Sequence, residues 1–312
     1  MADLTKMIAV PLDGSQNAMK SIDYINLIFG PKHDLEVTLL YVLTSLPSLL
    51  VDDRDMGHED RLRLKSIEDK NVQMAERILA QGKKALIQKG FGDEKIKTIY
   101  KQKKLGIPRD ISMWADDRQA DAVVISTTGR SRLEAFFMGE VARKLLEYCK
   151  ICPVWIVSGV AKSNHVLIAV DSSENALRAV DHAGFMLSGT ECQVTLFHSM
   201  RDLRRFVPKE VLKEAPELEE LWKQKAGQQI GPYMKKANDM LLQAGLTEKQ
   251  VKTKVVDGSR SATKDILDEA KSTNCGTIVI GRRGQSAEKE FSMGSVASKV
   301  VEAAAMTVSV VP

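Results

Sequence analysis

Short apolar runs alternate with amphipathic stretches in the first part of the chain. Runs of strand length, rich in β-branched and aliphatic residues, are found at 7–12, 36–42, 95–100, 121–126 and 154–157. Between them, apolar residues at helical spacing predict helices at 17–29, 72–89, 109–117 and 141–148. Residues 44–65 are charged and lack a long apolar stripe, so we expect an irregular segment with one short amphipathic stretch. This alternation predicts an α/β fold with a doubly wound parallel sheet.

The same pattern recurs in the second part of the chain. The run 166–171 matches 8–13 at an offset of 158 residues, and from residue 95 onward the two parts align without gaps at an offset of 155. A duplication of this length predicts two tandem five-stranded domains with a short linker at 158–165 that lets them pack closely. The predicted domains are residues 1–160 and 161–312.

Composition and charge narrow the class of protein. Apolar residues make up 44% of the 312 residues and charged residues 28%, which is typical of a soluble globular protein. A net charge of +4 without a dominant basic block does not favour nucleic-acid binding. No apolar run approaches the length that spans a membrane, so no membrane partner is expected. Four cysteines without a signal peptide favour a reducing cytoplasm.

The strongest chemical signal lies near the end of the second domain. A buried-strand run, 277–280, leads into Gly281-Arg282-Arg283-Gly284; nine residues later Gly294-Ser295 opens an Ala/Val-rich helical pattern. Glycine lets backbone N–H groups approach a ligand, and a helix N-terminus offers unpaired donors and a partial positive charge. The pattern therefore predicts an anion site, most often one for phosphate. The alternative is a tight turn without a ligand.

With these residues in place, both halves resemble the universal stress protein family. Some members carry Gly-x-x-Gly, nine residues and Gly-Ser, as this chain does from Gly281 onward. The strand that ends in Asp matches at Asp13-Gly14-Ser15 and at Asp171-Ser172-Ser173, and the late Cys-Pro-Val matches at Cys152. The resemblance implies two Rossmann-like domains that each have five parallel strands. It also implies that the final strands, at the sheet edges, pair across the halves as an intramolecular pseudo-dimer; a further homodimer stays open.

The resemblance also implies a place for ATP across the carboxyl ends of strands one and four. Val170 and Asp171, with Ser172 and Ser173 in the same turn, would border the adenine and ribose, and His198 and Ser199 would form the far wall. Backbone around Gly281 and Gly284 would hold the ribose and phosphates, and the N–H groups of Ser295 and Val296 after Gly294 would bind phosphate. The Ser295 hydroxyl would donate to phosphate or cap the helix. Arg282 and Arg283 are either phosphate ligands or solvated loop residues, and Mg²⁺ would arrive with the nucleotide.

The first half departs from this motif. Ser126 stands in place of Gly281, and Glu140 in place of Ser295, while Gly129 matches Gly284. A carboxylate at a helix N-terminus satisfies the same dipole as phosphate and repels phosphate. We therefore expect a nucleotide-free first half, although its intact Asp13-Gly14-Ser15 leaves an adenosine-type ligand open.

Other motifs carry weaker signals. Cys149-Lys150-Ile151-Cys152 has redox spacing but closes a predicted helix instead of opening one, so packed thiols are favoured. The five histidines show no metal-ligand spacing, and no Walker lysine or nucleophile elbow is found. We expect a protein that binds ATP in its second half and acts in stress adaptation without substantial catalysis. The alternatives are a slow ATPase or phosphotransferase that uses Asp171, and a nucleotide-independent scaffold. The insertions 46–67 and 208–222 are candidates for lids or partner surfaces.

Overall fold

A computed structural model describes residues 5–51, 56–127, 139–159, 162–257, 261–285 and 293–312. The boundary predicted between residues 160 and 161 lies outside these described residues.

Each half forms five parallel strands in the same order. The first-half strands are β1 (Lys6–Pro11), β2 (Leu35–Leu43), β3 (Ile96–Gln102), β4 (Ala122–Ser126) and β5 (Val154–Val157). The second-half strands are β6 (His165–Ala169), β7 (Gln193–Met200), β8 (Val251–Asp257), β9 (Thr277–Gly281) and β10 (Thr307–Val311). The first half orders its strands β3-β2-β1-β4-β5 and the second β8-β7-β6-β9-β10, and all neighbours within a half are parallel. The predicted α/β fold is therefore confirmed.

Helices cover both faces of the sheet, because successive strand residues point to opposite faces. The first-half helices are α1 (Met19–Ile28), α2 (Ser48–Val51), α3 (His58–Gln88), the 3₁₀ turn η1 (Asp93–Lys95), α4 (Ile107–Asp117) and α5 (Glu140–Tyr148). The second-half helices are α6 (Glu174–Leu187), the 3₁₀ turn η3 (Leu203–Arg205), α7 (Lys209–Glu214), α8 (Glu217–Gln243), α9 (Ala262–Ser272) and α10 (Ser295–Ala303). One apolar cluster joins one face of the sheet to α1, α3, α6 and α8, and a second joins the other face to α4, α5, α9 and α10.

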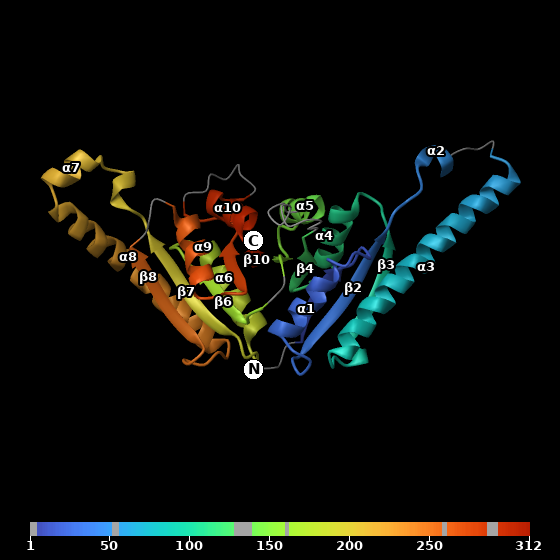
Figure 1. The fold of residues 1–312 in the computed structure, drawn as a ribbon, viewed down its shortest axis with the longest axis horizontal. Helices are drawn as coiled ribbons and strands as arrows, with labels where there is room; N and C mark the ends of the chain where they lie inside the picture. Colours follow the sequence, from blue (N-terminus) through green and yellow to red (C-terminus); the bar gives the residue numbers. More distant parts are fainter. Residues whose placement is uncertain (1–4, 52–55, 128–138, 160–161, 258–260, 286–292) are drawn as a thin grey trace.

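The two halves join through their last strands. β5 and β10 pair antiparallel, with Trp155 opposite Ser309, so the chain forms one sheet of ten strands (Figure 1). The expected pairing of the two halves is confirmed. β5 and β10, each at an edge of its own half, thus lie at the centre of the whole sheet, and β3 and β8 are its edges.

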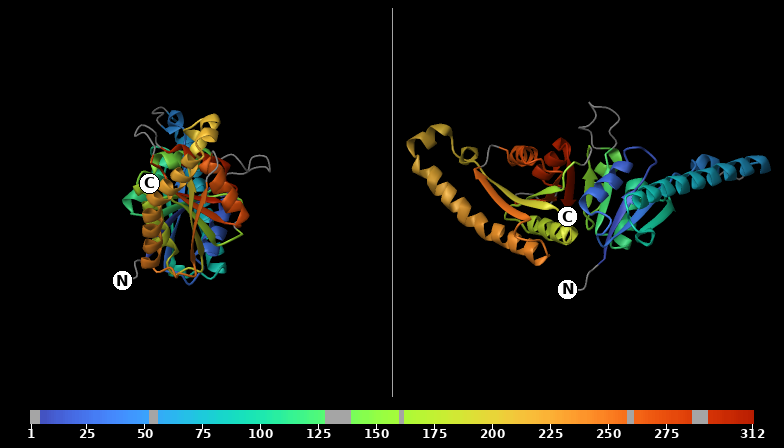
Figure 2. Two further views of the ribbon diagram at one scale, coloured as in Figure 1. Left: turned by 90° about the vertical axis from the view of Figure 1, so that its left-hand side faces the viewer. Right: turned by 60° about the horizontal axis from the view of Figure 1, so that its bottom comes forward.

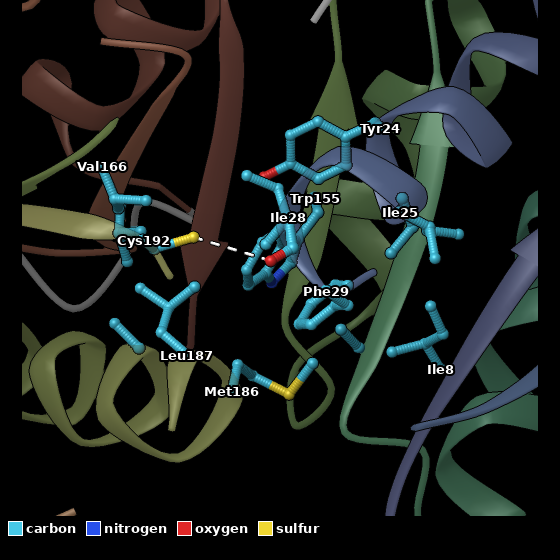
Figure 3. Packing of buried hydrophobic residues seen from close by; sticks show 14 of the residues in the cluster. Ile8, Tyr24, Ile25, Ile28, Phe29, Trp155, Val166, Met186, Leu187 and Cys192 are labelled. Carbon is cyan, nitrogen blue, oxygen red and sulfur yellow. Dashed lines mark hydrogen bonds between the residues drawn. The ribbon is translucent and has the colours of Figure 1, made fainter. Parts of the chain in front are cut away.

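Buried side chains fill the joint beside these strands. Trp155 and Tyr24 from the first half lie near Met186, Leu187 and Cys192 from the second (Figure 3). The Trp155 indole Nε1 donates to His182 Nε2 at 2.9 Å, and the Tyr24 hydroxyl bonds the Thr277 hydroxyl at 2.8 Å. Apolar burial therefore supplies the area of the joint, and these polar contacts specify its register.

The long helices α3 and α8 extend beyond the sheet at opposite ends of the molecule (Figures 1 and 2). The expectation of an irregular segment at 44–65 is wrong for its last part, since α3 begins at His58 instead of near residue 72. In residues 58–70 of α3 all side chains except the half-buried Leu64 are exposed, so this part of the helix has no continuous apolar stripe. Glu59 and Asp60 favour the helix start, and Arg63 pairs with Asp60 at 3.2 Å. Across the described residues, none of the helices has the length and hydropathy to cross a membrane.

Candidate functional site

The carboxyl ends of β6, β7 and β9 meet at one edge of the second half. β6 lies between β9 and β7. The chain runs from β6 to β7 and β8 on one side, and then crosses to β9 on the other side of β6, so the strand order reverses at β6. Such a switch in strand order opens a crevice in which α/β sheets bind ligands. The predicted site residues that come from these three strand ends therefore lie at one edge of the sheet.

Asp171 connects the turn after β6 to the glycine loop. Its Oδ1 accepts from the Ser173 backbone N–H at 3.0 Å and from the Ser173 hydroxyl, and its Oδ2 accepts from the Gln285 N–H at 3.2 Å. Ser173 in turn caps α6 by accepting from the Ala176 N–H at 3.1 Å, and Ser172 lies half-buried between them. Gln285 was absent from the expected site, because a backbone donor leaves no mark in a sequence.

His198 and Ser199, near the end of β7, are held by neighbours on either side. The ring Nδ1 of His198 lies 2.7 Å from the Val170 carbonyl oxygen, which can only accept, so Nδ1 carries the proton. Burial lowers the pKa of His198, so the ring is neutral at pH 7 and its Nε2 is an acceptor. The Ser199 hydroxyl donates to Asp265 Oδ2 at 2.5 Å. No sequence motif linked Asp265, in α9, to this wall.

The glycines of the loop have different structural reasons. A Cβ at Gly281 would lie 2.7 Å from the backbone oxygen of Asn175, so glycine allows β9 to pass under the start of α6. A Cβ at Gly284 would lie 2.6 Å from Asp171 Oδ2, so glycine there admits the Asp171 carboxylate. At Gly294 a Cβ would meet nothing nearer than 3.4 Å in the part of the chain described. Packing therefore explains the first two glycines and leaves the third unexplained.

The start of α10 is open to an anion. Gly294 is its N-cap and donates its N–H to the Arg282 carbonyl at 2.9 Å, and among the described residues no side chain caps the helix. Ser295 is the exposed first helical residue, so its expected capping role is wrong. Val296 follows in the same turn, which contains no acidic residue. The N–H groups of this turn are the donors that helices leave unpaired.

Arg283 lies directly beside this helix start. Its Cα would be 3.4 Å from a Cβ at Gly294, and its Nε is buried without a hydrogen-bond partner among the described residues. A buried donor without a partner is costly, so the Arg283 Nε is a candidate donor to a bound anion.

Arg282 points in another direction, which corrects its expected role. Its side chain is 6% exposed and reaches the first half, where Nη1 donates to the Cys149 carbonyl at 2.6 Å and Nη2 donates to the Leu146 carbonyl. Arg282 is therefore neither a phosphate ligand nor a solvated loop residue in this structure.

The matching site in the first half is built differently. Glu140 is the first residue of α5, but its carboxylate is exposed and pairs with Lys144 at 2.6 Å instead of capping the helix. The hydrogen bond and charge of Lys144 lower the pKa of Glu140, which keeps the negative charge at this helix start. The Asp turn is retained, since the Ser15 N–H donates to Asp13 Oδ1 at 2.9 Å. Gly129 lies outside the described residues.

The cysteine pair is packed in the core. Cys149 and Cys152 are both buried, and burial raises the pKa of each thiol, which is opposite to the activation that redox cysteines need. The structure therefore supports the interpretation of Cys149 and Cys152 as packed thiols.

Comparisons with known proteins show which family has this architecture. The model of the universal stress protein family matches residues 5–158 and again residues 162–312. Universal stress protein MJ0531 of Methanocaldococcus jannaschii is 27% identical over 158 residues, which is 50% of this chain and 83% of that protein. Universal stress protein YxiE of Bacillus subtilis is 25% identical over 165 residues, 47% of this chain and 98% of that protein.

A solved structure covers both halves at once. A universal stress protein from Archaeoglobus fulgidus superposes with a TM-score of 0.61 at 19% identity, over 99% of this chain and 97% of that chain. This likeness shows a shared two-half fold. Because the family model matches each half over nearly its whole length, the chain belongs to the universal stress protein family as a tandem two-domain member.

Proposed function

We propose that the second half binds an adenine nucleotide, ATP, and that the chain acts in stress adaptation in the cytoplasm without substantial catalysis. The observation that carries the proposal is the nearness of two features: the buried Arg283 Nε and the start of α10 at Gly294, neither of which has a side-chain partner among the described residues. A phosphate there would accept from both, and its approach would explain a glycine that packing leaves unexplained.

The remaining residues fit the rest of a nucleotide. Val170, Asp171, Ser172 and Ser173 would border the adenine and ribose, and His198 and Ser199 would form the far wall. Gly284, Gly294, Ser295, Val296 and Arg283 would hold the phosphates, with Gly281 supporting the loop. Mg²⁺ would come with the phosphates as an ion that the nucleotide carries.

The contacts of Asp171 support binding without turnover. Its oxygens already accept from Ser173 and Gln285, so the carboxylate orients the loop instead of standing free to activate water. Single-turnover assays should show no ATP hydrolysis above the rate of buffer, and Asp171→Ala should not change that rate. Hydrolysis that Asp171→Ala abolishes would favour the slow ATPase instead.

Matched aspartates in the two halves test the site itself. Titration calorimetry with ATP should show one site per chain. Asp171→Ala should weaken binding about tenfold, the equivalent of ~1.4 kcal/mol, while Asp13→Ala in the first half should leave it unchanged. Two ATP molecules per chain, or equal effects of the two substitutions, would contradict a site confined to the second half.

A further inference from the structure

The contact of Arg282 with the first half has a specific chemistry. Leu146 and Cys149 lie at the end of α5, where the last carbonyl groups of a helix have no partner within the helix and carry a partial negative charge. The guanidinium of Arg282 donates to both carbonyls, so it caps a helix of the other half. These are charge-assisted hydrogen bonds in a buried site, the stronger kind.

The backbone of Arg282 is tied to the candidate site on the other side. Its N–H donates to the Val311 carbonyl at the end of β10 at 2.6 Å, and its carbonyl accepts from the Gly294 N–H at 2.9 Å. Gly294 is the N-cap of α10. One residue thus joins α5 of the first half, the last strand of the sheet and the start of the helix that faces the ligand.

Among the described residues, this anchor exists on one side of the molecule. The residue that matches Arg282 in the first half is Thr127, whose N–H keeps the corresponding bond to the Val157 carbonyl at 3.0 Å. A threonine side chain has no guanidinium and is too short for the same reach. Within the part of the chain that the structure describes, the half with the intact glycine motif is therefore the half whose loop is fastened to its neighbour.

We propose that Arg282 is a positioning residue, which holds the glycine loop and the start of α10 in their ligand-binding geometry by anchoring them to α5 of the first half. This inference rests on the proposed function, nucleotide binding by the second half. It assigns the first half, with its altered motif, the role of a support for the site of its neighbour.

Hydrogen exchange on the full chain without nucleotide tests the anchor directly. Arg282→Thr, which installs the residue of the first half, should make the Gly294 amide exchange about tenfold faster, since the acceptor of this amide is no longer held. Arg282→Lys, which retains one cation for the two carbonyls, should give an intermediate rate. Arg283→Thr, the matched control in the same loop, should leave this rate unchanged. An unchanged Gly294 rate in Arg282→Thr would overturn the inference.

ATP affinity and amide exchange together separate positioning from direct contact. Calorimetry should show that Arg282→Thr weakens ATP binding about tenfold, because the start of α10, which would hold the phosphates, is misplaced. Arg283→Thr should weaken ATP binding without changing the exchange rate of the Gly294 amide. Weaker ATP binding in Arg282→Thr with an unchanged Gly294 exchange rate would make Arg282 a phosphate ligand and overturn its positioning role. Wild-type protein that does not bind ATP would overturn the proposed function, whereas wild-type binding that Arg282→Thr leaves unaltered would overturn the role of Arg282 alone.

Discussion

The two halves share a strand order and differ where β4 and β9 end. In the second half, Gly281 lets the start of α6 pass close above β9, and α6 begins at Glu174. In the first half Ser126 takes the place of Gly281, and α1 begins at Met19 and not at Gln16, the residue that matches Glu174. A later helix start fits the presence of a side chain at 126. Glycine at the end of β9 thus goes with an early start of α6, and serine at the end of β4 with a later start of α1.

The halves also differ in how their last helix begins and what holds it. α10 begins with Gly294-Ser295 and is tied by Arg282 to the first half, while α5 begins with Glu140 paired to Lys144. In the part of the chain that the structure describes, the two halves therefore share the scaffold and differ in the start of the last helix, where the candidate anion site of the second half lies.

The largest effect is expected from transferring the acidic residue of the first half to the second. Ser295→Glu places a carboxylate at the start of α10, where two like charges about 4 Å apart repel by ~4 kcal/mol at an effective dielectric constant near 20. ATP affinity should fall at least about a hundredfold in calorimetry. Glu140→Ser, the reverse exchange, should leave ATP affinity at the second half unchanged. Retained affinity in Ser295→Glu would place the phosphates elsewhere.

The strand-end difference can be tested through stability. Gly281→Ser forces a Cβ to within 2.7 Å of the Asn175 backbone oxygen, so it should destabilise the protein by about 2 kcal/mol in urea unfolding. Ser126→Gly should have a smaller effect, because it removes a side chain instead of forcing one into an occupied space. Equal effects of the two substitutions would show that the close approach at Gly281 does not matter.

The stability of the protein should decrease at low pH because of His182, which lies at the joint between the halves. Burial lowers the pKa of His182 to about 3, and its Nε2 accepts from Trp155, so the folded ring is neutral. Below about pH 6.5 the unfolded chain binds a proton that the folded chain does not, so stability should fall toward low pH by no more than about 1.4 kcal/mol per pH unit from this group. His182→Gln should flatten the curve between about pH 6.5 and 3, as measured by urea unfolding at each pH. Identical curves for the two proteins would exclude His182 as the source.

A smaller effect is expected at the buried hydroxyl pair. Tyr24→Phe leaves the Thr277 hydroxyl without its cross-half partner and should cost about 1 kcal/mol. Combining it with Thr277→Val should cost less than the sum of the two single substitutions, which a double-mutant cycle measures. Strict additivity would show that the bond contributes nothing to joining the halves.

Much of the fold was predictable from the sequence because its periodicity is strong. The strands, their parallel orientation and the duplication follow from apolar runs and from two segments that align over a whole half. The first part of α3, from His58, could not be predicted, since a helix segment that is exposed almost throughout has no continuous apolar stripe. The candidate site was located through its glycine spacing and the turn at Asp171.

Only the tertiary structure decided what the individual loop residues contact. Arg282 and Arg283 are adjacent and chemically alike. Arg282 caps a helix of the other half, whereas the buried Nε of Arg283, beside α10, has no partner among the described residues. Asp265 and the Gln285 N–H likewise join the site through contacts between distant segments. The sequence by itself determined the repeated α/β scaffold and the place of the glycine loop, because local periodicity and turn chemistry specify these. The direction of each side chain depends on how two copies of that scaffold pack, and no local pattern records that.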